Sequence, residues 1–592
     1  MMMYLLQRLA LLLVLPFSLA TAQEPTLTPL QGSTPAQWRV IWGADPAHEA
    51  TISWTTAEEG KQHQVLIGLG GPGAPDKRVQ AQRNGAYSLD GGETDTVAAA
   101  WYHHVRLADL RPATRYRFTI DSDGKRSRAF YFRTAPDDDQ PFKLIYGGDS
   151  RTGHEARQQM NRLMSELIAE EPSILAFTHG GDYIQDGGRW SDWGPWLSHQ
   201  ELSTGRDGRV LPIVPVRGNH DGGPLYDEIF DDHGGKDLNY STTQLSSKVA
   251  IVSLNSNIST TGDQALWLEE ELDRLRPLNR WLLTQYHRPL YPAVKSPGPA
   301  KSTWVPLFEG FDVDLVLESD GHVMKRTMPI RNDEHDPSGV TYIGEGGLGV
   351  PQRQPDTERW YLKAPGMAAR GHHVTVLSFE PDSLRMLTVG PAPSGADFVP
   401  QGFKSIVPKN GVWRYLAGSE PEADWASAEF QDANWPRGEA GFGFGDDDDK
   451  TVLEDMRRNY SRVYVRRRIP AGDLSKVESL ALMMRYDDGF IAYVNGQEVI
   501  RVGVSSGRGA TAGEVASHEA QADFEFFLLA DWKELTRGDD MILCIEGHNG
   551  GVTSSDFTLD PFLIADPGNL PTSKGKPGRV TLDDHTLSPR KQ

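Results

Sequence analysis

The sequence feature that most constrains the fold is an apolar run, Val214 to Val216, that gives way to Asn219, His220 and Asp221. Buried polar groups must find partners, and apolar side chains would stabilise a strand end better. Three side chains that bind metals or transfer protons are therefore costly at this position unless they have a function. The stretch predicts a site for a cation, an anion or a reaction at the end of a buried strand.

Four other apolar runs of the same region also end in polar side chains. They are 142–146 followed by Asp149, 174–178 followed by Asp182, 281–285 followed by His287, and 313–317 followed by His322. Amphipathic helical patterns over 155–171 and 263–276 alternate with these runs, which is typical of α/β layers around a central sheet. Open α/β sheets bind ligands beyond the carboxyl ends of their strands. We therefore expect the five endings to form one site in an α/β domain that spans 141–390.

The region before this domain has a different pattern. Residues 36–135 contain short alternating strands separated by turn residues, with no helical stretch, which predicts an N-terminal β-sandwich. The segment 104–116 resembles the end of a fibronectin type III-like module. We expect a multidomain protein whose first folded unit is this sandwich.

The N-terminus indicates export. Arg8 is followed by an apolar run and then by Ala20-Thr21-Ala22, which is the pattern of a secretory signal peptide over residues 1–22. Residues 23–35 are expected to be a flexible leader. The alternative is an uncleaved membrane anchor, but the run is short and contains Pro16, and no later segment approaches the ~18 apolar residues of a membrane span. We predict a secreted or periplasmic protein with no membrane span.

Charge and cysteine content exclude some classes of protein. The net charge is −21, with 81 acidic residues against 60 basic ones, and no long basic run offsets it. A nucleic acid polymer is therefore not an expected partner, because phosphate affinity comes largely from clustered Lys and Arg. Cys544 is the only cysteine, so an intrachain disulfide is excluded and the residue is expected to be a small buried apolar group.

The C-terminal third is expected to be a second all-β unit. A linker over 391–408 precedes strand-like runs within 409–566, and Asn495-Gly496 is a strong hairpin signal. This pattern predicts a β jelly roll. The unit resembles the galactose-binding-like modules appended to exported bacterial enzymes, and the resemblance implies a glycan as its partner. Residues 567–592 are polar and rich in Pro, Lys and Gly, which predicts a disordered tail.

The motif series of the α/β region resembles that of the calcineurin-like metallophosphoesterases. The motifs are Gly148-Asp149, Gly181-Asp182, Gly218-Asn219-His220-Asp221, His287 and Gly321-His322. With the preceding sandwich, the resemblance is to the purple acid phosphatase branch. It implies an α/β/β/α-type domain and an exported phosphoesterase that uses a metal-bound hydroxide. The implied cofactors are one or two divalent or trivalent transition metals, Fe, Zn or Mn, and the implied substrate is a small phosphate ester or nucleotide.

The resemblance also implies a role for each matched residue. Asp182 would bridge two metal positions, and Asp149 would contribute to the first of them. The ligands of the second position would be Asn219, His287 and His322. His220 would stabilise phosphate charge or protonate the leaving group. Asp221 would support this loop from behind.

Three departures from the family pattern affect the first metal position. Met324 stands where a second His is expected, Gln185 where a Tyr is expected, and Arg151 where other relatives have a His. One interpretation is that His154 or Tyr183 supplies a replacement ligand. A second is that Arg151 stands in for the missing cation, because a guanidinium binds phosphate bidentately. A third is a catalytically degenerate surface protein that binds phosphate or glycan.

Overall fold

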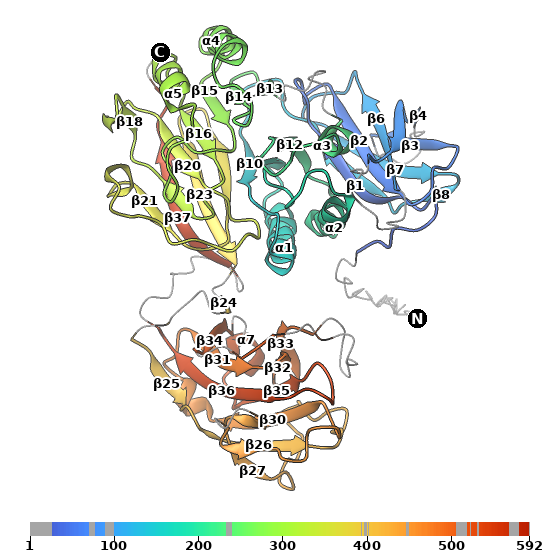
Figure 1. Cartoon of the computed structure of the whole chain (residues 1–592), viewed down its shortest axis with the longest axis vertical. Coiled ribbons are helices and arrows are strands. Elements are labelled where there is room, and N and C mark those ends of the chain that lie inside the picture. The colour runs from blue at the N-terminus through green and yellow to red at the C-terminus, as the bar shows by residue number, and fades with distance from the viewer. Residues whose placement is uncertain are drawn as a thin grey trace, which may run out of the picture.

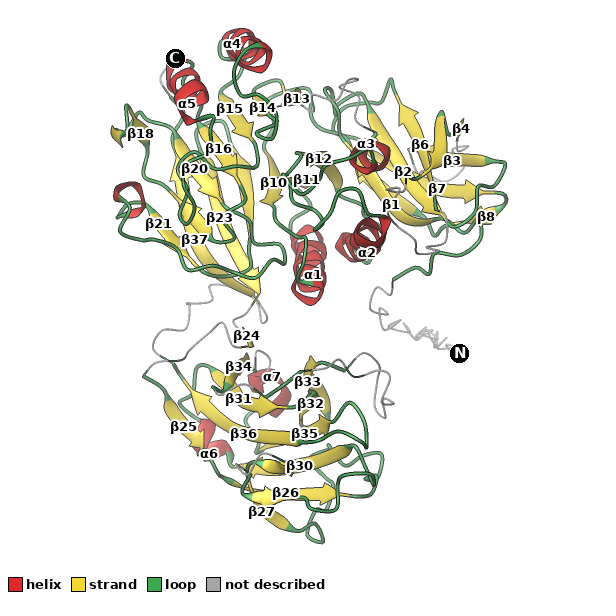
Figure 2. Cartoon of the chain, in the orientation of Figure 1, coloured by secondary structure: helices red, strands yellow, loops and turns green. Residues whose placement is uncertain are grey.

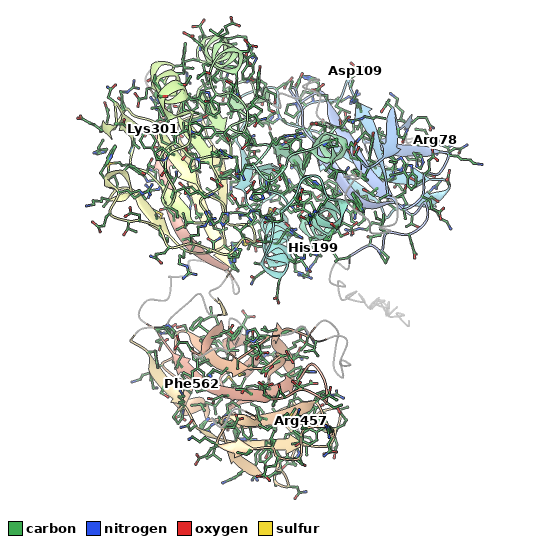
Figure 3. The ribbon with its side chains drawn as sticks, in the orientation of Figure 1. Arg78, Asp109, His199, Lys301, Arg457 and Phe562 are labelled. Carbon is green, nitrogen blue, oxygen red and sulfur yellow. The ribbon has the colours of Figure 1, made fainter. Side chains whose placement is uncertain are left out.

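The computed structural model describes most of the chain (Figure 1). The described residues are 27–69, 77–88, 100–231, 240–391, 394–395, 400, 402–445, 449–504, 515, 518–520, 523–529, 532–567 and 579–590. The expected signal peptide, residues 1–22, lies outside this set. In Figure 1 the domains before residue 391 form the upper body and the C-terminal domain lies below it. The side chains of both are drawn in Figure 3, where Lys301 marks the upper body and Phe562 the lower domain.

The N-terminal unit has the two sheets that the sequence predicts. One sheet contains β1 (Ala36–Ile41), β2 (Ala50–Thr56), β6 (Trp101–Leu107) and β5 (Arg83–Ala86). The other contains β4 (Lys77–Gln80), β3 (His63–Gly68), β7 (Arg115–Ser122) and β8 (Lys125–Arg126), with β9 (Phe130–Arg133) paired to β7. Buried aromatic side chains such as Trp54 and Phe118 pack between the two sheets.

The first of these sheets continues into the central domain. β1 pairs in parallel with β12 (Pro212–Pro215), with Val40 opposite Pro212. The combined sheet has ten strands in the order β37-β23-β22-β10-β11-β12-β1-β2-β6-β5. Its remaining members are β10 (Phe142–Gly147), β11 (Ile174–His179), β22 (Val374–Phe379), β23 (Leu384–Pro391) and β37 (Arg579–Leu587). The sandwich is thus joined to the central sheet by main-chain hydrogen bonds.

A second sheet completes the central domain. Its seven strands run in the order β13-β14-β15-β16-β20-β17-β21. They are β13 (Ser241–Ser246), β14 (Val249–Ser253), β15 (Trp281–Gln285), β16 (Leu315–Glu318), β20 (Thr341–Gly344), β17 (Met324–Arg326) and β21 (Met367–Ala369). A short hairpin, β18 (Ile330–Arg331) and β19 (Glu334–His335), lies beside it. Leu144 of β10 and Leu283 of β15 share one apolar core, so the two sheets pack face to face.

Helices cover the outer faces of both sheets (Figure 2). The apolar faces of α1 (His154–Glu170), α2 (Trp190–Gln200) and α3 (Leu225–Phe230) share a core with β10 to β12. Those of α4 (Asp263–Leu275) and α5 (Lys301–Gly310) share a core with β14 to β16. Short 3-10 turns lie at Glu201–Ser203 and Trp360–Leu362. The central domain therefore has the expected α/β/β/α layers.

The C-terminal domain is a sandwich of two sheets around its own core. One contains β24 (Ser394–Gly395), β34 (Glu525–Leu528), β31 (Leu480–Tyr486), β36 (Phe557–Ala565), β28 (Phe442–Phe444) and β29 (Thr451–Val452), and β25 (Lys404–Val407) pairs with β36. The other contains β27 (Arg437–Glu439), β26 (Val412–Ala417), β30 (Arg462–Ile469), β35 (Met541–His548), β32 (Gly489–Val494) and β33 (Gln497–Val502). The domain also contains α6 (Ala471–Leu474) and α7 (Trp532–Thr536). Cys544 is buried there, as expected.

Two boundaries differ from the sequence predictions. The expected linker 391–408 includes β25, which belongs to the C-terminal domain because it pairs with β36. The expected disordered tail includes β37, which pairs antiparallel with β23 from Leu384–Leu587 to Pro391–Arg579. Ion pairs from Arg326 to Asp583 and from Arg385 to Asp584 hold this strand in place. A polar composition therefore did not prevent this segment from forming an edge strand.

None of the described helices is both long enough and apolar enough to cross a membrane.

Candidate metal centre

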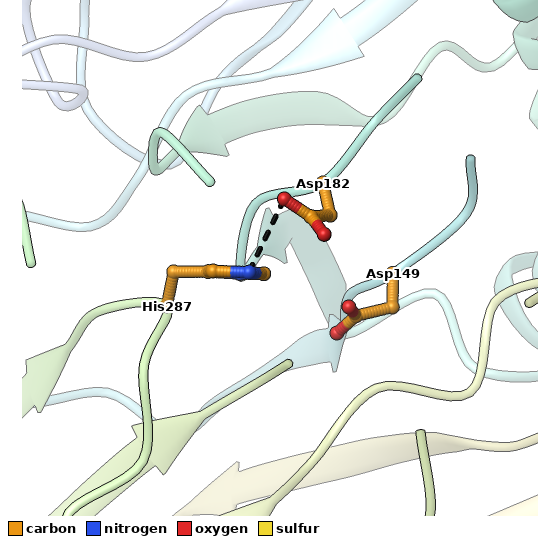
Figure 4. A group of neighbouring side chains, drawn as sticks. All are labelled: Asp149, Asp182 and His287. Atoms are coloured by element: carbon orange, nitrogen blue, oxygen red, sulfur yellow. Dashed lines mark ion pairs between the residues drawn. The ribbon is translucent and has the colours of Figure 1, made fainter. Parts of the chain in front are cut away.

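The ends of three strands bring three buried side chains together. Asp149 follows β10, Asp182 follows β11, and His287 follows β15 of the second sheet. Each offers a ligand atom, and these atoms all lie within 4.8 Å of one another. Figure 4 shows the side chains converging from separate segments, with an ion pair between Asp182 and His287. The structure thus brings the side chains of these three strand ends together.

The backbone at the strand ends has unusual dihedral angles. Asp149, Asp182 and His322 have φ values of 56°, 57° and 59°, in the left-handed region. Non-glycine residues rarely adopt this conformation, and Asp does so more readily than most because its short side chain can form local hydrogen bonds. Gly218 lies against Asp182 so closely that a Cβ atom there would collide with its backbone and carboxylate. The backbone is thus bent to direct these side chains toward the gap between the sheets.

The convergent atoms fit a cation. Asp149 Oδ1, Asp182 Oδ2 and His287 Nε2 are buried and have no hydrogen-bond partner in the described chain. Buried polar atoms are normally hydrogen-bonded, whereas these three have only ion-pair contacts with neighbouring side chains. Carboxylate oxygen together with imidazole nitrogen is a donor set suited to Zn, Fe or Mn rather than Ca²⁺. The residues present therefore fit a transition metal.

Hydrogen bonds fix the orientation of His287. Its Nδ1 donates to the carbonyl of Gly180 at 2.9 Å, which is the support commonly found behind metal-binding imidazoles. Its Nε2 lies 3.2 Å from Asp182 Oδ1 and 3.5 Å from Asp320 Oδ1. Burial alone would lower the pKa of His287, but Asp182, Asp320 and Asp149 raise it well above its usual value. The site therefore concentrates negative charge and favours a positive group at this point.

Asp221 accepts hydrogen bonds from backbone groups on two loops of the centre. Its Oδ2 accepts hydrogen bonds from the backbone N–H of Asp182 at 2.8 Å and of Gly218 at 2.6 Å. Its Oδ1 accepts a hydrogen bond from the N–H of Tyr183 at 2.9 Å. One buried carboxylate thus ties the Asp182 loop to the loop that carries His220. Asp221 positions other residues, and its contacts do not include a metal-binding atom.

His220 lies at the open side of the centre. Its Nδ1 donates to the carbonyl of Gln185 at 2.7 Å, and the backbone N–H of His220 donates to Asp182 Oδ1 at 3.0 Å. Its side chain is 27% exposed, with Nε2 3.9 Å from Asp182 Oδ2. The free ring nitrogen is therefore within reach of both solvent and the centre.

Arg151 extends across the other side of the centre. Its Nε lies 3.3 Å from Asp182 Oδ2, its Nη1 donates to Gln185 Oε1 at 2.6 Å, and its Nη2 donates to His322 Nε2 at 3.3 Å. The side chain is only 14% exposed. The guanidinium thus lies beside carboxylate and imidazole groups that would otherwise converge on a cation.

His322 and Asn219 are placed apart from each other. His322 Nε2 lies 3.5 Å from Asp149 Oδ1 and faces Arg151. Burial, followed by Arg353 and Arg151, lowers the pKa of His322 to about 3, which keeps the ring neutral. Asn219 is exposed and lines a hollow next to Asp320. The grouping of Asn219, His287 and His322 around one metal stays a prediction.

The two replacement ligands considered for the first position have other environments. The Tyr183 ring is buried, stacks on His179 at 3.8 Å between ring centres, and packs in an aromatic core. Its hydroxyl accepts a hydrogen bond from the N–H of Val216 at 3.3 Å. His154 is exposed at the start of α1, where its ring meets the edge of His199. These environments do not favour either side chain as a replacement ligand.

The sequence reasoning assigned no role to Asp320 and Lys295. Asp320 Oδ1 lies 2.6 Å from Lys295 Nζ and 3.5 Å from His287 Nε2, and its backbone N–H donates to Asp149 Oδ2 at 2.8 Å. Asp320 directly precedes the Gly-His motif, which could have identified it. Lys295 follows no strand end or motif, and only the folded chain shows its contact with the centre.

Two parts of the chain match families of known proteins. Residues 35–134 match the family described as "Purple acid Phosphatase, N-terminal domain", and residues 153–324 match the family described as "Calcineurin-like phosphoesterase". The central region is thus similar to calcineurin-like phosphoesterases, and the region before it is similar to the N-terminal domain of purple acid phosphatases. These matches support a phosphoesterase hydrolase.

Individual relatives share part of the chain. An uncharacterized protein of Mycobacterium tuberculosis H37Rv is 24% identical over 361 residues, which are 53% of this chain and 63% of that protein. The phosphoenolpyruvate phosphatase of Allium cepa is 24% identical over 375 residues, 55% of this chain and 73% of that protein. Purple acid phosphatase 15 of Arabidopsis thaliana is 22% identical over 295 residues, 41% of this chain and 53% of that protein. The match thus spans slightly less than two thirds of the mycobacterial relative.

A solved structure has a similar fold over part of the chain. The purple acid phosphatase PPD1 from yellow lupin (Lupinus luteus) seeds aligns with a TM-score of 0.52 and 16% identity, over 60% of this chain and 72% of that chain. At this identity the likeness establishes the fold alone. It agrees with the α/β/β/α layers and the N-terminal sheets described above.

Proposed function

We propose that the chain is an exported metal-dependent phosphoesterase that hydrolyses small phosphate esters. The observation that carries the proposal is the convergence of Asp149 Oδ1, Asp182 Oδ2 and His287 Nε2, three buried atoms with no hydrogen-bond partner in the described chain. The matches to calcineurin-like phosphoesterases and to purple acid phosphatases support the same reaction class.

These three residues would hold a transition metal, Fe, Zn or Mn. When bound, such a metal polarises a phosphoryl oxygen and lowers the pKa of water, which makes a nucleophile available near neutral pH. Asp221 keeps Asp182 in position because its carboxylate accepts hydrogen bonds from the backbone N–H groups of Asp182 and Gly218. His287 is held by the Gly180 carbonyl, so its Nε2 has a fixed direction.

Arg151 supplies positive charge on the other side of the centre. Because its guanidinium lies 3.3 Å from Asp182 Oδ2, it occupies a place where a second cation would otherwise balance the carboxylates. A guanidinium donates two parallel hydrogen bonds to phosphate oxygens. Of the three interpretations of the first metal position, the geometry favours this one, in which Arg151 binds the phosphoryl group and one metal suffices.

His220 is the candidate general acid that protonates the leaving group. Its Nδ1–H is held by the Gln185 carbonyl, so Nε2 carries the lone pair or proton that faces the open side. General acid catalysis requires a side chain within hydrogen-bond reach of the departing oxygen. We therefore assign protonation of the leaving group to His220 Nε2.

A hollow beside the centre would receive the leaving group. It has a volume of about 320 Å³, and its wall includes Asn219, Arg288, Lys295 and Asp320. Three prolines, at positions 289, 297 and 299, also line it. Basic and apolar surfaces together suit a small phosphate ester with a polar or anionic leaving group, such as a nucleotide.

Export and glycan binding are the remaining parts of the proposal. The N-terminal sequence pattern supports a secreted or periplasmic location. The two-sheet C-terminal domain is compatible with a jelly roll that holds a glycan near the enzyme. The alternative function is a catalytically degenerate protein that binds phosphate or glycan at a surface.

Metal content and hydrolysis decide between these functions. The purified chain should contain at least one tightly bound transition metal per molecule by elemental analysis. After removal of the metal by a chelator, hydrolysis of p-nitrophenyl phosphate should be lost, and adding Mn²⁺, Zn²⁺ or iron should restore it. A chain that binds none of these metals and cleaves no phosphate ester in their presence would exclude the enzyme and leave the binding protein.

A further inference from the structure

The C-terminal domain contains a second group of carboxylates that the proposed reaction does not use. Asp487 follows β31, Asp556 directly precedes β36, and Glu519 lies in the segment before β34. One carboxylate oxygen from each lies within 4.8 Å of the other two. Three segments that are distant in the sequence thus direct negative charge to one point.

Asp487 distinguishes this group from an ordinary acidic surface. Its side chain is only 6% exposed, and none of the described residues donates a hydrogen bond to its carboxylate or forms an ion pair with it. The adjacent Asp488 differs, because its carboxylate accepts hydrogen bonds from the N–H groups of His518 at 2.9 Å and Gly550 at 2.6 Å. Burying a carboxylate without a compensating partner is strongly unfavourable. Asp487 is therefore a largely buried carboxylate with no ion-pair partner among the described residues.

The neighbouring residues hold Glu519 near Asp487. His518 directly precedes Glu519, and its ring stacks on Tyr486 at 4.1 Å between ring centres. Its Nε2 lies 3.0 Å from Glu525 Oε1, and its Nδ1 lies 3.1 Å from the carbonyl of Tyr486. Both ring nitrogens thus have partners, so the imidazole is not free to join the group. The ligand atoms that the group offers are carboxylate oxygens.

The negative charges around Asp487, like its burial, disfavour its ionised form. Burial, followed by the like charges of Asp488, Asp556 and Glu519, raises the pKa of Asp487 to about 7, and His518 only partly opposes this. Like charges in one site disfavour the ionised form. A bound cation would relieve both the repulsion and the missing hydrogen bonds.

We propose that Asp487, Glu519 and Asp556 form a calcium site. Ca²⁺ binds oxygen ligands at 2.3–2.6 Å, so oxygens on opposite sides of one ion are roughly 5 Å apart, as this group allows. Mg²⁺ usually binds through one or two carboxylates and requires near-ideal octahedral geometry, so a set of three carboxylates suits Ca²⁺ better. Glu519 is exposed, so water can complete the coordination. The ion would join the turn after β31, the segment before β34 and the start of β36.

The test is calcium binding by the full chain after treatment with a chelator. We expect isothermal titration with CaCl₂ to show one site in the wild type that Asp487→Asn weakens by at least tenfold. Calcium should also raise the melting temperature of the wild type by several degrees, because a ligand that binds only the folded state stabilises it. Asp182→Asn, which removes a carboxylate from the other centre, should retain the calcium site.

Three results would overturn the proposal. They are the absence of calcium binding by the wild type, equal calcium affinity in wild type and Asp487→Asn, and loss of calcium binding in Asp182→Asn alone. If Asp487→Asn does not fold, as judged by circular dichroism, Asp556→Asn serves in its place. Because phosphate ester hydrolysis is measured separately, failure of this site leaves the proposed reaction unaffected, and the reverse also holds.

Discussion

The two sides of the metal centre achieve charge balance differently. On the Asp182 side, defined by Asp182 and His287, the buried atoms Asp182 Oδ2 and His287 Nε2 have ion-pair contacts but no hydrogen bond within the described chain, so they can still bind an added cation. On the Arg151 side, defined by Arg151 and His322, a guanidinium already lies among the potential ligands. The difference shows that ligand groups at the ends of these strands can be balanced either by a bound metal ion or by a basic side chain. An added metal can be exchanged, whereas Arg151 is always present.

The largest expected effect tests the Asp182 side. Asp182→Asn removes a charge that the centre needs for its metal, so we expect a loss in kcat on the order of 10³-fold, as for other principal electrostatic groups. Metal content should fall with it. The measurement is hydrolysis of a phosphate ester together with elemental analysis. Asp109→Asn is a matched control, because Asp109 is exposed and has a similar φ of 56°. Retained activity in folded Asp182→Asn would disprove the assignment.

The next effect tests the Arg151 side. Arg151→Gln should lower kcat/KM by about 10²-fold, because a charge-assisted contact to the transferring phosphoryl group is lost. Arg151→Lys should recover only part of this, since a lysine cannot make the paired contact. Metal content should stay at the wild-type level in both variants. If Arg151→Gln hydrolyses phosphate esters as fast as the wild type, the guanidinium has no role in the reaction.

A related substitution sharpens the same comparison. Arg151→His replaces the fixed charge by a potential ligand next to Asp149 and His322. If the Arg151 side differs from a metal position only through this residue, the variant should bind more metal per chain than the wild type. An unchanged metal content would show that other features of this side prevent metal binding.

The third effect is on stability, and it concerns His104, which contacts the helix that follows Asp221. His104 Nε2 donates to the carbonyl of Glu228 in α3, the helix that follows Asp221. Burial lowers the pKa of His104 to about 3; Asp231 opposes this effect, and Arg39 and Arg83 add to it. The unfolded chain therefore binds a proton near pH 6.5 and the folded chain does not, so stability falls as pH decreases below 6.5. At pH 5 this costs about 2 kcal/mol.

Urea unfolding at pH 7.5 and pH 5 measures this dependence. His104→Gln, which cannot be protonated, should reduce the difference between the two pH values by about 2 kcal/mol. His48→Gln is the control, because His48 is exposed. An identical pH dependence in wild type and His104→Gln would show that His104 does not couple protonation to unfolding.

The smallest expected effect concerns Tyr183. Because its hydroxyl contacts backbone groups and its ring packs against His179, Tyr183→Phe should change kcat less than about twofold. The purified protein should also lack the visible absorption of tyrosinate bound to iron. A coloured preparation whose absorption disappears in Tyr183→Phe would show that the Arg151 side holds iron through Tyr183. Colour that persists in this variant would show that another tyrosine binds iron.

The sequence predicted the centre best where a residue ends a strand. Asp149, Asp182 and His287 follow apolar runs whose periodicity is clear, so their convergence could be inferred without coordinates. The placement of Arg151 depends on the bend at Asp149, which no periodicity reveals. Lys295 lies in a loop, and its contact with Asp320 arises only when the two segments come together. Local sequence patterns therefore predict which residues lie at strand ends. They do not predict which loop residues contact the site.

The same limit applies to the fold. The sandwich, the α/β layers and most strand bounds follow from alternation and helical periodicity. The pairing of β1 with β12 could not be predicted, because it joins segments about 170 residues apart and leaves no local signal. β37 was missed for a similar reason, since its partner β23 is nearly 200 residues earlier. Its flanking Pro, Lys and Gly residues also indicated disorder.

The return of β37 to the central sheet has a mechanical consequence. Pro391 and Arg579 are register partners on adjacent strands, so the chain leaves and re-enters the sheet at neighbouring points. The C-terminal domain is therefore attached by two tethers that begin side by side, which restricts its rotation more than a single linker would. Truncation after residue 566 would remove an edge strand of the sheet that carries Asp149 and Asp182. Separating the two domains cleanly requires excision of the intervening segment and direct joining of residues 391 and 579.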